Sequence, residues 1–229
     1  MPYPQTYTNE LELRGSLPAG AAYLRPVPVD IQNKTFYLAI KRIFDIFFSA
    51  TALTVLLPFF LLVALIIRLT TKASVLFTQE RVGRNGKLFK VYKFRTMKPT
   101  APTDVPTNSL DHADSYITKI GRVLRKTSFD ELPQLVNVLK GDMSVIGPRP
   151  LIEGESKIHA LRTQNGVYQI RPGVTGWAQV NGRDYLTDEE KVALDTEYLR
   201  RLSLGFDLRC VARTISVIFT GKGFAEGKK

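Results

Sequence analysis

The chain has 229 residues, a formal net charge of +11 and a sequence pI of about 9.8. This length allows one domain with a core, with or without appendages, and the positive excess favours an anionic partner such as acidic lipid, a phosphorylated substrate or nucleic acid. A single cysteine, Cys210, excludes an intrachain disulfide framework, and the two distant histidines, His112 and His159, argue against a histidine-based zinc site.

Residues 1–33 are polar, contain prolines and show no sustained period, which predicts a flexible N-terminal arm. Residues 41–68 are then almost wholly apolar between basic ends. As a straight helix, the roughly 25 inner residues of this segment would reach about 37 Å, which is enough to cross the hydrocarbon core of a bilayer. The segment therefore predicts a helix that enters a membrane.

Pro58 stands near the middle of this apolar segment, where a proline removes a backbone hydrogen bond and kinks a helix. Basic residues flank both ends, Arg42 before and Lys72 after, although a spanning helix keeps its basic residues mainly on the cytoplasmic side. The residues alone leave two structures open: a re-entrant helix-break-helix, or a single-pass anchor with an incidental proline. Asp45 would be costly in lipid unless it lies near the membrane interface or finds a partner, and its closeness to Arg42 favours the interface.

Residues 75–97 predict a β-hairpin, because two alternating stretches surround an Asn-Gly pair that begins at residue 85. The arms are rich in lysine and arginine. Lys90, Lys93 and Arg95 are expected to form a basic stripe on one side of a strand, facing head groups or a diphosphate, which makes Lys93 and Arg95 candidate substrate-binding residues. The alternative is an ordinary solvated face.

A proline-rich loop is expected over residues 99–114, as a lid or a linker. The apolar spacing then predicts helices over residues 116–125, 132–140, 151–164, 187–201 and 206–219, with a loop over 171–183. One apolar face of the last helix suits either packing on a core, the commoner case, or contact with a membrane surface. The expected fold class is therefore α+β, mostly helical, with one small β-hairpin and amphipathic surface helices.

Two adjacent carboxylates, Asp130 and Glu131, stand where the helix over residues 132–140 is expected to begin. Ser128 and Glu131 match the capping box S-x-x-E, but with Ser128 as the cap, Pro133 would remove an amide that the helix needs. With Asp130 as the cap, Pro133 falls in the first turn and nothing is lost, so either Asp130 is the cap or the turn is irregular. Both carboxylates then lie at the positive end of a helix, which lowers a carboxylate pKa and attracts anions. An ionised carboxylate there could attack phosphorus or hold a divalent metal.

Arg149 lies in the sequence Gly-Pro-Arg-Pro, whose prolines stiffen the turn that presents it. A guanidinium can clamp phosphate oxygens in a bidentate manner, although an ordinary surface turn is an equal alternative. Arg171, Trp177 and Arg183 are further candidates for contact with a substrate. Trp177 could stack on a base, but a lone tryptophan in a loop is more often a packing anchor.

Four motifs occur in order along the chain: KRIFDIFFS, FTQERVGRNGKLFKVYKFRTM, KTSFDELPQLVNVLKGDMSVIGPRP and RPGVTGWAQVNGR. From about residue 41 to the C-terminus the chain resembles the bacterial sugar transferases, the small monotopic phosphoglycosyl transferases. This resemblance implies transfer of a sugar 1-phosphate from a UDP-sugar to polyprenyl phosphate, with release of UMP. It implies a covalent phosphosugar intermediate on Asp130, with Glu131 as its partner, Arg149 on phosphate, and Mg²⁺ bound at Asp130.

The resemblance also implies a re-entrant membrane helix broken at Pro58. The expected organisation is a flexible arm over residues 1–33, a re-entrant membrane hairpin over 34–72 and a catalytic domain over 73–229, on the cytoplasmic face of the bacterial inner membrane. Expected partners are the two substrates and membrane lipid, with a homo-oligomer or a complex with downstream glycosyltransferases as options. Nucleic acid is not expected, because no recognition helix is evident. The competing prediction is a non-catalytic basic adaptor at the membrane, and the sugar and the pathway stay open.

Overall fold

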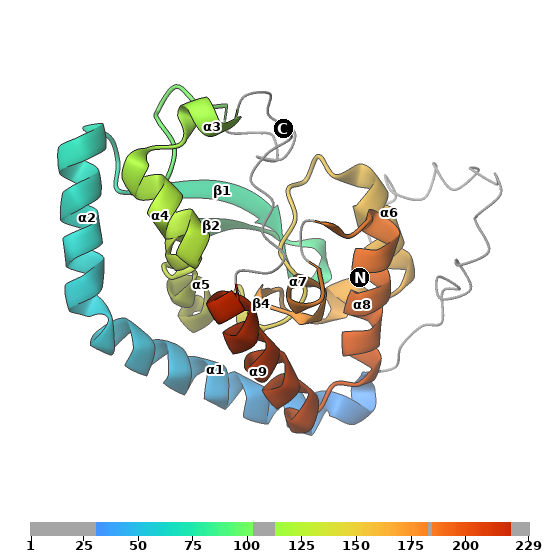
Figure 1. Cartoon of the computed structure of the whole chain (residues 1–229). Coiled ribbons are helices and arrows are strands. Elements are labelled where there is room, and N and C mark those ends of the chain that lie inside the picture. The colour runs from blue at the N-terminus through green and yellow to red at the C-terminus, as the bar shows by residue number, and fades with distance from the viewer. Residues whose placement is uncertain (1–30, 103–112, 183–184, 221–229) are drawn as a thin grey trace.

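The computed structural model describes residues 31–102, 113–182 and 185–220 (Figure 1). Nearly all of the predicted arm over residues 1–33, most of the proline-rich loop, and Arg183 lie outside the described residues. The described part is mostly helical with two small two-stranded sheets, which confirms the predicted α+β class.

The apolar N-terminal segment forms two helices, α1 (Thr35–Val55) and α2 (Leu57–Thr71), which follow a short 3₁₀ turn, η3 (Gln32–Lys34). Pro58 lies in the first turn of α2, where its missing amide breaks no helical hydrogen bond. The pair bends by 61° at the junction. Among the described residues no single helix is long and apolar enough to cross a membrane, whereas this bent pair qualifies by length and composition.

Figure 1 shows α1 along the base of the domain and α2 turning up beside it. The inner side of α2 packs on the domain, because Val63 and Ile67 form a buried cluster with Phe94 and Leu124. The outer sides of both helices expose large apolar side chains. These are Phe36, Ile40, Ile43, Phe44, Ile46, Phe47, Phe48, Val55, Leu57, Leu61, Leu62, Leu65 and Leu69. An apolar surface of this extent is typical of a membrane or protein contact.

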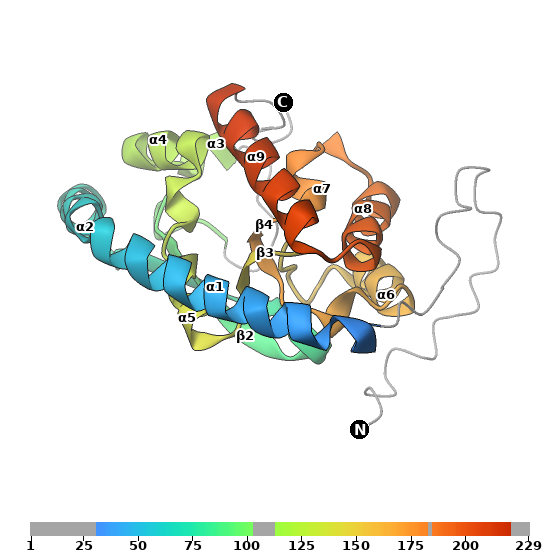
Figure 2. The same ribbon diagram turned by 90° about the horizontal axis from the view of Figure 1, so that it is seen from below.

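The last helix, α9 (Leu204–Thr220), lies on the same side of the molecule as α1, the side that Figure 2 faces. Its buried residues include Phe206 and Cys210, whereas Leu208, Val211 and Ile215 are exposed. The commoner expectation, that the predicted apolar face packs on the core, is therefore wrong. This face adds to the exposed apolar side chains of α1 and α2.

A polar contact fastens α1 to the rest of the domain. Asp45 is only 4% exposed and accepts hydrogen bonds from Ser144 Oγ (3.1 Å) and from the Val145 amide (2.9 Å). The carboxylate therefore has protein partners, which was the second of the two expected ways to offset its charge. Nearby, Lys41 Nζ forms a 2.7 Å ion pair with Asp207 of α9.

The predicted hairpin is confirmed, with β1 (Leu76–Val82) antiparallel to β2 (Leu88–Phe94). Residues 83–87 connect the strands and contain the 3₁₀ turn η4 (Arg84–Gly86). The Asn-Gly pair lies in this turn with both φ angles positive, 57° and 73°. The loop is longer than the two-residue turn that the pair usually signals.

A second sheet was not predicted. It pairs β3 (Ser144–Ile146) in parallel with β4 (Gly173–Thr175), inside the segment expected to be a loop. A side chain at Gly173 would collide with the backbone of Gly147, so this close approach requires glycine. This sheet therefore holds the turn that follows β3 against the segment that contains β4.

Short helices and 3₁₀ turns surround the two sheets. They are α3 (Ala113–Tyr116), α4 (Lys119–Thr127), η6 (Phe129–Glu131), α5 (Gln134–Lys140), α6 (Ser156–Gln164), η7 (Val167–Gln169), α7 (Trp177–Val180) and α8 (Asp188–Arg200). The predicted helix over residues 116–125 is thus divided, because Thr118 caps α4 by accepting from the Gly121 amide. A complete capping box between Thr187 and Glu190 begins α8.

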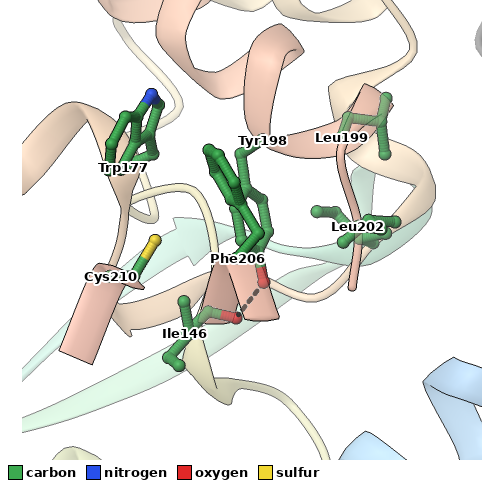
Figure 3. Packing of buried hydrophobic residues seen from close by; sticks show 8 residues of the cluster. Ile146, Trp177, Tyr198, Leu199, Leu202, Phe206 and Cys210 are labelled. Atoms are coloured by element: carbon green, nitrogen blue, oxygen red, sulfur yellow. Dashed lines mark hydrogen bonds between the residues drawn. The ribbon is translucent and has the colours of Figure 1, made fainter. Parts of the chain in front are cut away.

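The largest buried cluster packs α7, α8 and α9 against β3 (Figure 3). The Trp177 and Phe206 rings lie 4.7 Å apart between centroids, and Trp177 Nε1 donates to Glu197 Oε2 at 2.8 Å. Tyr198 reaches β3 through a hydrogen bond from its hydroxyl to the Ile146 carbonyl, at 3.3 Å. Trp177 is thus a packing anchor, with its indole N–H already bonded.

Candidate active site

The two adjacent carboxylates lie in a 3₁₀ turn and not at the start of an α-helix. Ser128 adopts a left-handed conformation (φ 58°) that ends α4, and Asp130 and Glu131 follow in η6. Helix α5 begins only after Pro133, and neither Ser128 nor Pro133 makes a side-chain cap bond. The prediction of Asp130 as the helix cap is therefore wrong, whereas the alternative of an irregular turn and the argument against a Ser128 capping box are both confirmed. Pro133 is accommodated because the 3₁₀ turn that holds the two carboxylates is separate from α5.

Glu131 is buried and bound by two cations from distant parts of the chain. Lys93 of β2 donates to Glu131 Oε1 at 2.8 Å. Arg149, in the turn after β3, approaches the same carboxylate with both terminal nitrogens, at 3.0 Å to Oε1 and 3.4 Å to Oε2. Burial lowers the pKa of Lys93, against the opposing pull of Glu131. The fold thus brings together Lys93, Asp130, Glu131 and Arg149.

The carboxyl group of Asp130 has a different environment from that of Glu131. Burial first, and the charge of Glu131 second, raise the pKa of Asp130 to about 6, against the pull of Lys93, Arg125 and Arg149. The expectation that a helix end lowers this pKa is wrong. Since no hydrogen bond or ion pair within the described ranges engages the Asp130 carboxylate, its charge is offset only at longer range. A buried carboxylate with a raised pKa is stabilised when it forms a bond to an electrophile or when a cation lies nearby.

The Arg149 side chain is 33% exposed, so its guanidinium can contact a molecule that enters from solvent. Arg81 of β1 lies close by and donates to the Pro150 carbonyl at 3.2 Å. Burial, with the charge of Arg149 as the second cause, lowers the pKa of Arg81 to about 10. The sequence patterns gave no sign that Arg81 or Arg125 belongs to the site, yet both charges act on the carboxylate pair.

The predicted basic stripe on the hairpin is wrong. Lys90 and Lys93 are three residues apart on β2, so they point to opposite faces of the strand, and Lys90 is exposed. Arg95 follows the strand and donates through Nε to the Ser74 carbonyl at 2.8 Å. Of the three residues, only Lys93 contacts the carboxylate pair.

The remaining candidates lie elsewhere. Arg171 donates to the Gly141 carbonyl at 2.8 Å and lines a separate hollow beside α1. Trp177 belongs to the core described above. Arg183 is outside the described residues. Neither Arg171 nor Trp177 therefore joins Asp130 in this structure.

The carboxylate pair offers one ligand that suits Mg²⁺, the ion that the resemblance implies. Within the described ranges no three or more histidine, cysteine, aspartate or glutamate side chains gather as a metal cluster. Mg²⁺ keeps several waters and needs only one or two protein carboxylates. Asp130 fits such a contact, because a divalent cation would stabilise its ionised form, while the Glu131 oxygens already bind Lys93 and Arg149.

Fold and site together describe an α+β protein with an apolar helix pair and a carboxylate pair bound by basic side chains. A family model described as bacterial sugar transferase matches residues 36–221. The chain therefore belongs to the bacterial sugar transferase family, and both the predicted family and the predicted class of enzyme are confirmed.

Three relatives illustrate the similarity. The exopolysaccharide production protein PSS of Rhizobium leguminosarum bv. phaseoli is 41% identical over 82% of this chain and 99% of its own length. A UDP-glucose:undecaprenyl-phosphate glucose-1-phosphate transferase of Caulobacter vibrioides is 35% identical over 91% of this chain and 86% of its own length. The enzyme with the same description from Escherichia coli is 39% identical over 80% of this chain, which spans 41% of that longer protein.

Proposed function

We propose that this chain transfers a sugar 1-phosphate from a UDP-sugar to undecaprenyl phosphate and releases UMP, in the first membrane step of a surface polysaccharide or glycoconjugate. The names of the relatives support the substrates. The observation that carries the chemistry is the contrast between adjacent carboxylates. Glu131 is bound by Lys93 and Arg149, whereas no ion pair in the described part of the chain engages Asp130, whose pKa is raised to about 6.

In the first half-reaction, a carboxylate oxygen of Asp130 attacks the phosphorus that bears the sugar. A bond forms between this oxygen and phosphorus, and the phosphorus–oxygen bond to the uridine phosphate breaks, which releases UMP with the electron pair. The product is a phosphosugar ester on Asp130. The exposed guanidinium of Arg149 binds the phosphate oxygens, where added positive charge stabilises the transition state.

In the second half-reaction, a phosphate oxygen of undecaprenyl phosphate attacks the same phosphorus. The bond to Asp130 breaks and the carboxylate is restored. Mg²⁺, when bound at Asp130, supplies positive charge that neutralises the diphosphate. Glu131 keeps Lys93 and Arg149 in place beside the reacting group, so its role is to organise the two cations.

We also place the site at the cytoplasmic face of the inner membrane, with α1 and α2 as a re-entrant pair. Both ends of the pair contact the same domain: Lys41 binds Asp207, and Ile67 packs with Phe94 and Leu124. A spanning pair would have to draw part of that domain through the bilayer. The exposed apolar sides of α1, α2 and α9 support insertion from one side only.

Cysteines placed at the two ends of the helix pair are expected to react from the same side. We would replace Ala39 and Ala73 singly in a Cys210→Ser background and label intact spheroplasts and inverted vesicles with an impermeant maleimide. Both sites should react only in inverted vesicles, as should a cysteine at Lys157, an exposed reference in the catalytic domain. Labelling of the two sites from opposite sides would exclude the re-entrant arrangement.

The proposed activity is tested by incubating detergent-purified protein with Mg²⁺, undecaprenyl phosphate and a panel of UDP-sugars headed by UDP-glucose. We expect UMP and a lipid-linked sugar diphosphate, in equal amounts, from at least one donor. The adaptor alternative predicts no UMP with any donor. The panel also identifies the sugar, which neither the motifs nor the site geometry determines.

A further inference from the structure

We propose that Arg162 and Asp195 are positioning residues, which hold the backbone at Arg149 so that its guanidinium faces Glu131 and the phosphate. This inference rests on the proposed function, because it concerns how that site is built. Arg162 lies on α6 and Asp195 on α8, and the motifs gave no reason to single out either residue.

The contacts are direct. Arg162 donates from one terminal nitrogen to the Arg149 carbonyl at 2.7 Å, and from the other to Asp195 Oδ2 at 2.6 Å. The side chains of Arg162 and Asp195 are 3% and 1% exposed. Asp195 therefore fixes the guanidinium that in turn fixes the Arg149 peptide.

The hydrogen bond from Arg162 to the Arg149 carbonyl is one of three that bind consecutive carbonyls of the turn. The Pro148 carbonyl accepts from the Gly173 amide at 2.8 Å, and the Pro150 carbonyl accepts from Arg81 at 3.2 Å. The two prolines fix their own φ angles, and Pro150 restricts Arg149 to extended conformations. The Arg149 peptide plane is the main remaining freedom, and Arg162 binds its carbonyl.

Stability alone does not explain the buried pair. The Nε of Arg162 is buried and has no hydrogen-bond partner among the described residues, which is unfavourable for a charged group away from water. Helices α6 and α8 are also joined by a surface ion pair, Lys157 with Glu189 at 2.7 Å, and by the buried contact of Ile158 with Val192. The two helices thus have other contacts that hold them together.

The test is a double-mutant cycle measured by UMP release. Arg162→Lys keeps a positive charge for Asp195 but cannot reach both partners with a rigid fork. In the wild-type background we expect kcat to fall roughly 10- to 100-fold while KM for the UDP-sugar changes less than about threefold. In an Arg149→Lys background, the same change should lower kcat by less than about twofold, because the guanidinium that it positions is already gone.

Two controls separate positioning from general destabilisation. Leu199→Ala, in the core of α8, should lower the thermal midpoint without lowering kcat per folded molecule. If Arg162→Lys does not fold, Asp195→Asn replaces it in the cycle, since it keeps the shape and weakens the hold on Arg162. Equal losses of kcat in both backgrounds would overturn the inference while leaving wild-type UMP release intact. Absence of UMP release from the wild type would instead refute the proposed function itself.

Discussion

Asp130→Asn is expected to lower UMP release by roughly 10³-fold or more, because an amide cannot form the ester to phosphorus. The same substitution is expected to leave the thermal midpoint at pH 7 unchanged or higher. The folded-state pKa of Asp130, about 6, lies above its ordinary value of 3.8. The folded chain therefore binds this proton more tightly than the unfolded chain, and the ionised form at pH 7 opposes folding. Asparagine removes that opposition.

Kinetics and calorimetry on the same preparations check both halves of this result. Labelled donor without acceptor should leave sugar phosphate on denatured wild-type protein and none on the variant. Asp142→Asn is the matched control, since Asp142 contacts Asn137 and Lys140 and does not contact the carboxylate pair. Product formation by Asp130→Asn at the wild-type rate would eliminate the covalent mechanism.

Arg149→Ala is expected to lower kcat by roughly 10²- to 10³-fold, the usual effect of removing one donor from a developing negative charge. Arg149 supplies two contacts to Glu131, at 3.0 and 3.4 Å, so its loss also removes one of the two cations, with Lys93, that are seen to bind this buried carboxylate. Arg149→Lys keeps the charge but not the fork, and should retain intermediate activity.

Steady-state rates with saturating donor measure this effect, and Arg95→Ala serves as the control. Arg95 is also basic and was also a candidate, yet it binds Ser74 and not the carboxylate pair. We expect its removal to change kcat by less than about threefold. If Arg95→Ala proves as damaging as Arg149→Ala, the arrangement described for the site cannot be the active one.

Local patterns predicted a large part of the fold. The hairpin follows from alternation around an Asn-Gly pair, and the break in the apolar segment follows from Pro58. The parallel pair of β3 and β4 could not be predicted, because each strand has three residues and neither shows alternation. Its existence depends on a close backbone approach between Gly147 and Gly173, which is set by tertiary structure.

The candidate site likewise combines features that the sequence predicts with features that only the tertiary structure determines. The Asp-Glu pair and Arg149 stand out as residue types, and the fold brings them together. Which further cations surround these residues depends on the face of the strand from which each side chain projects and on helices that are distant in the sequence. Lys93 and Arg95 look alike in the sequence, but only Lys93 reaches Glu131. Arg162, which holds the Arg149 carbonyl, lies in a helix whose pattern carries no sign of this contact.

The buried carboxylate of α1 also constrains the order of assembly. Asp45 and its partner Ser144 are 99 positions apart, so the apolar helices leave the ribosome long before β3 exists. Until then Asp45 lacks the partners that make its burial tolerable and must remain hydrated. In the proposed re-entrant arrangement, the helix pair is therefore expected to reach its final depth in lipid only after the domain around β3 has folded. Settling into the bilayer would then be the last step in the biogenesis of this protein.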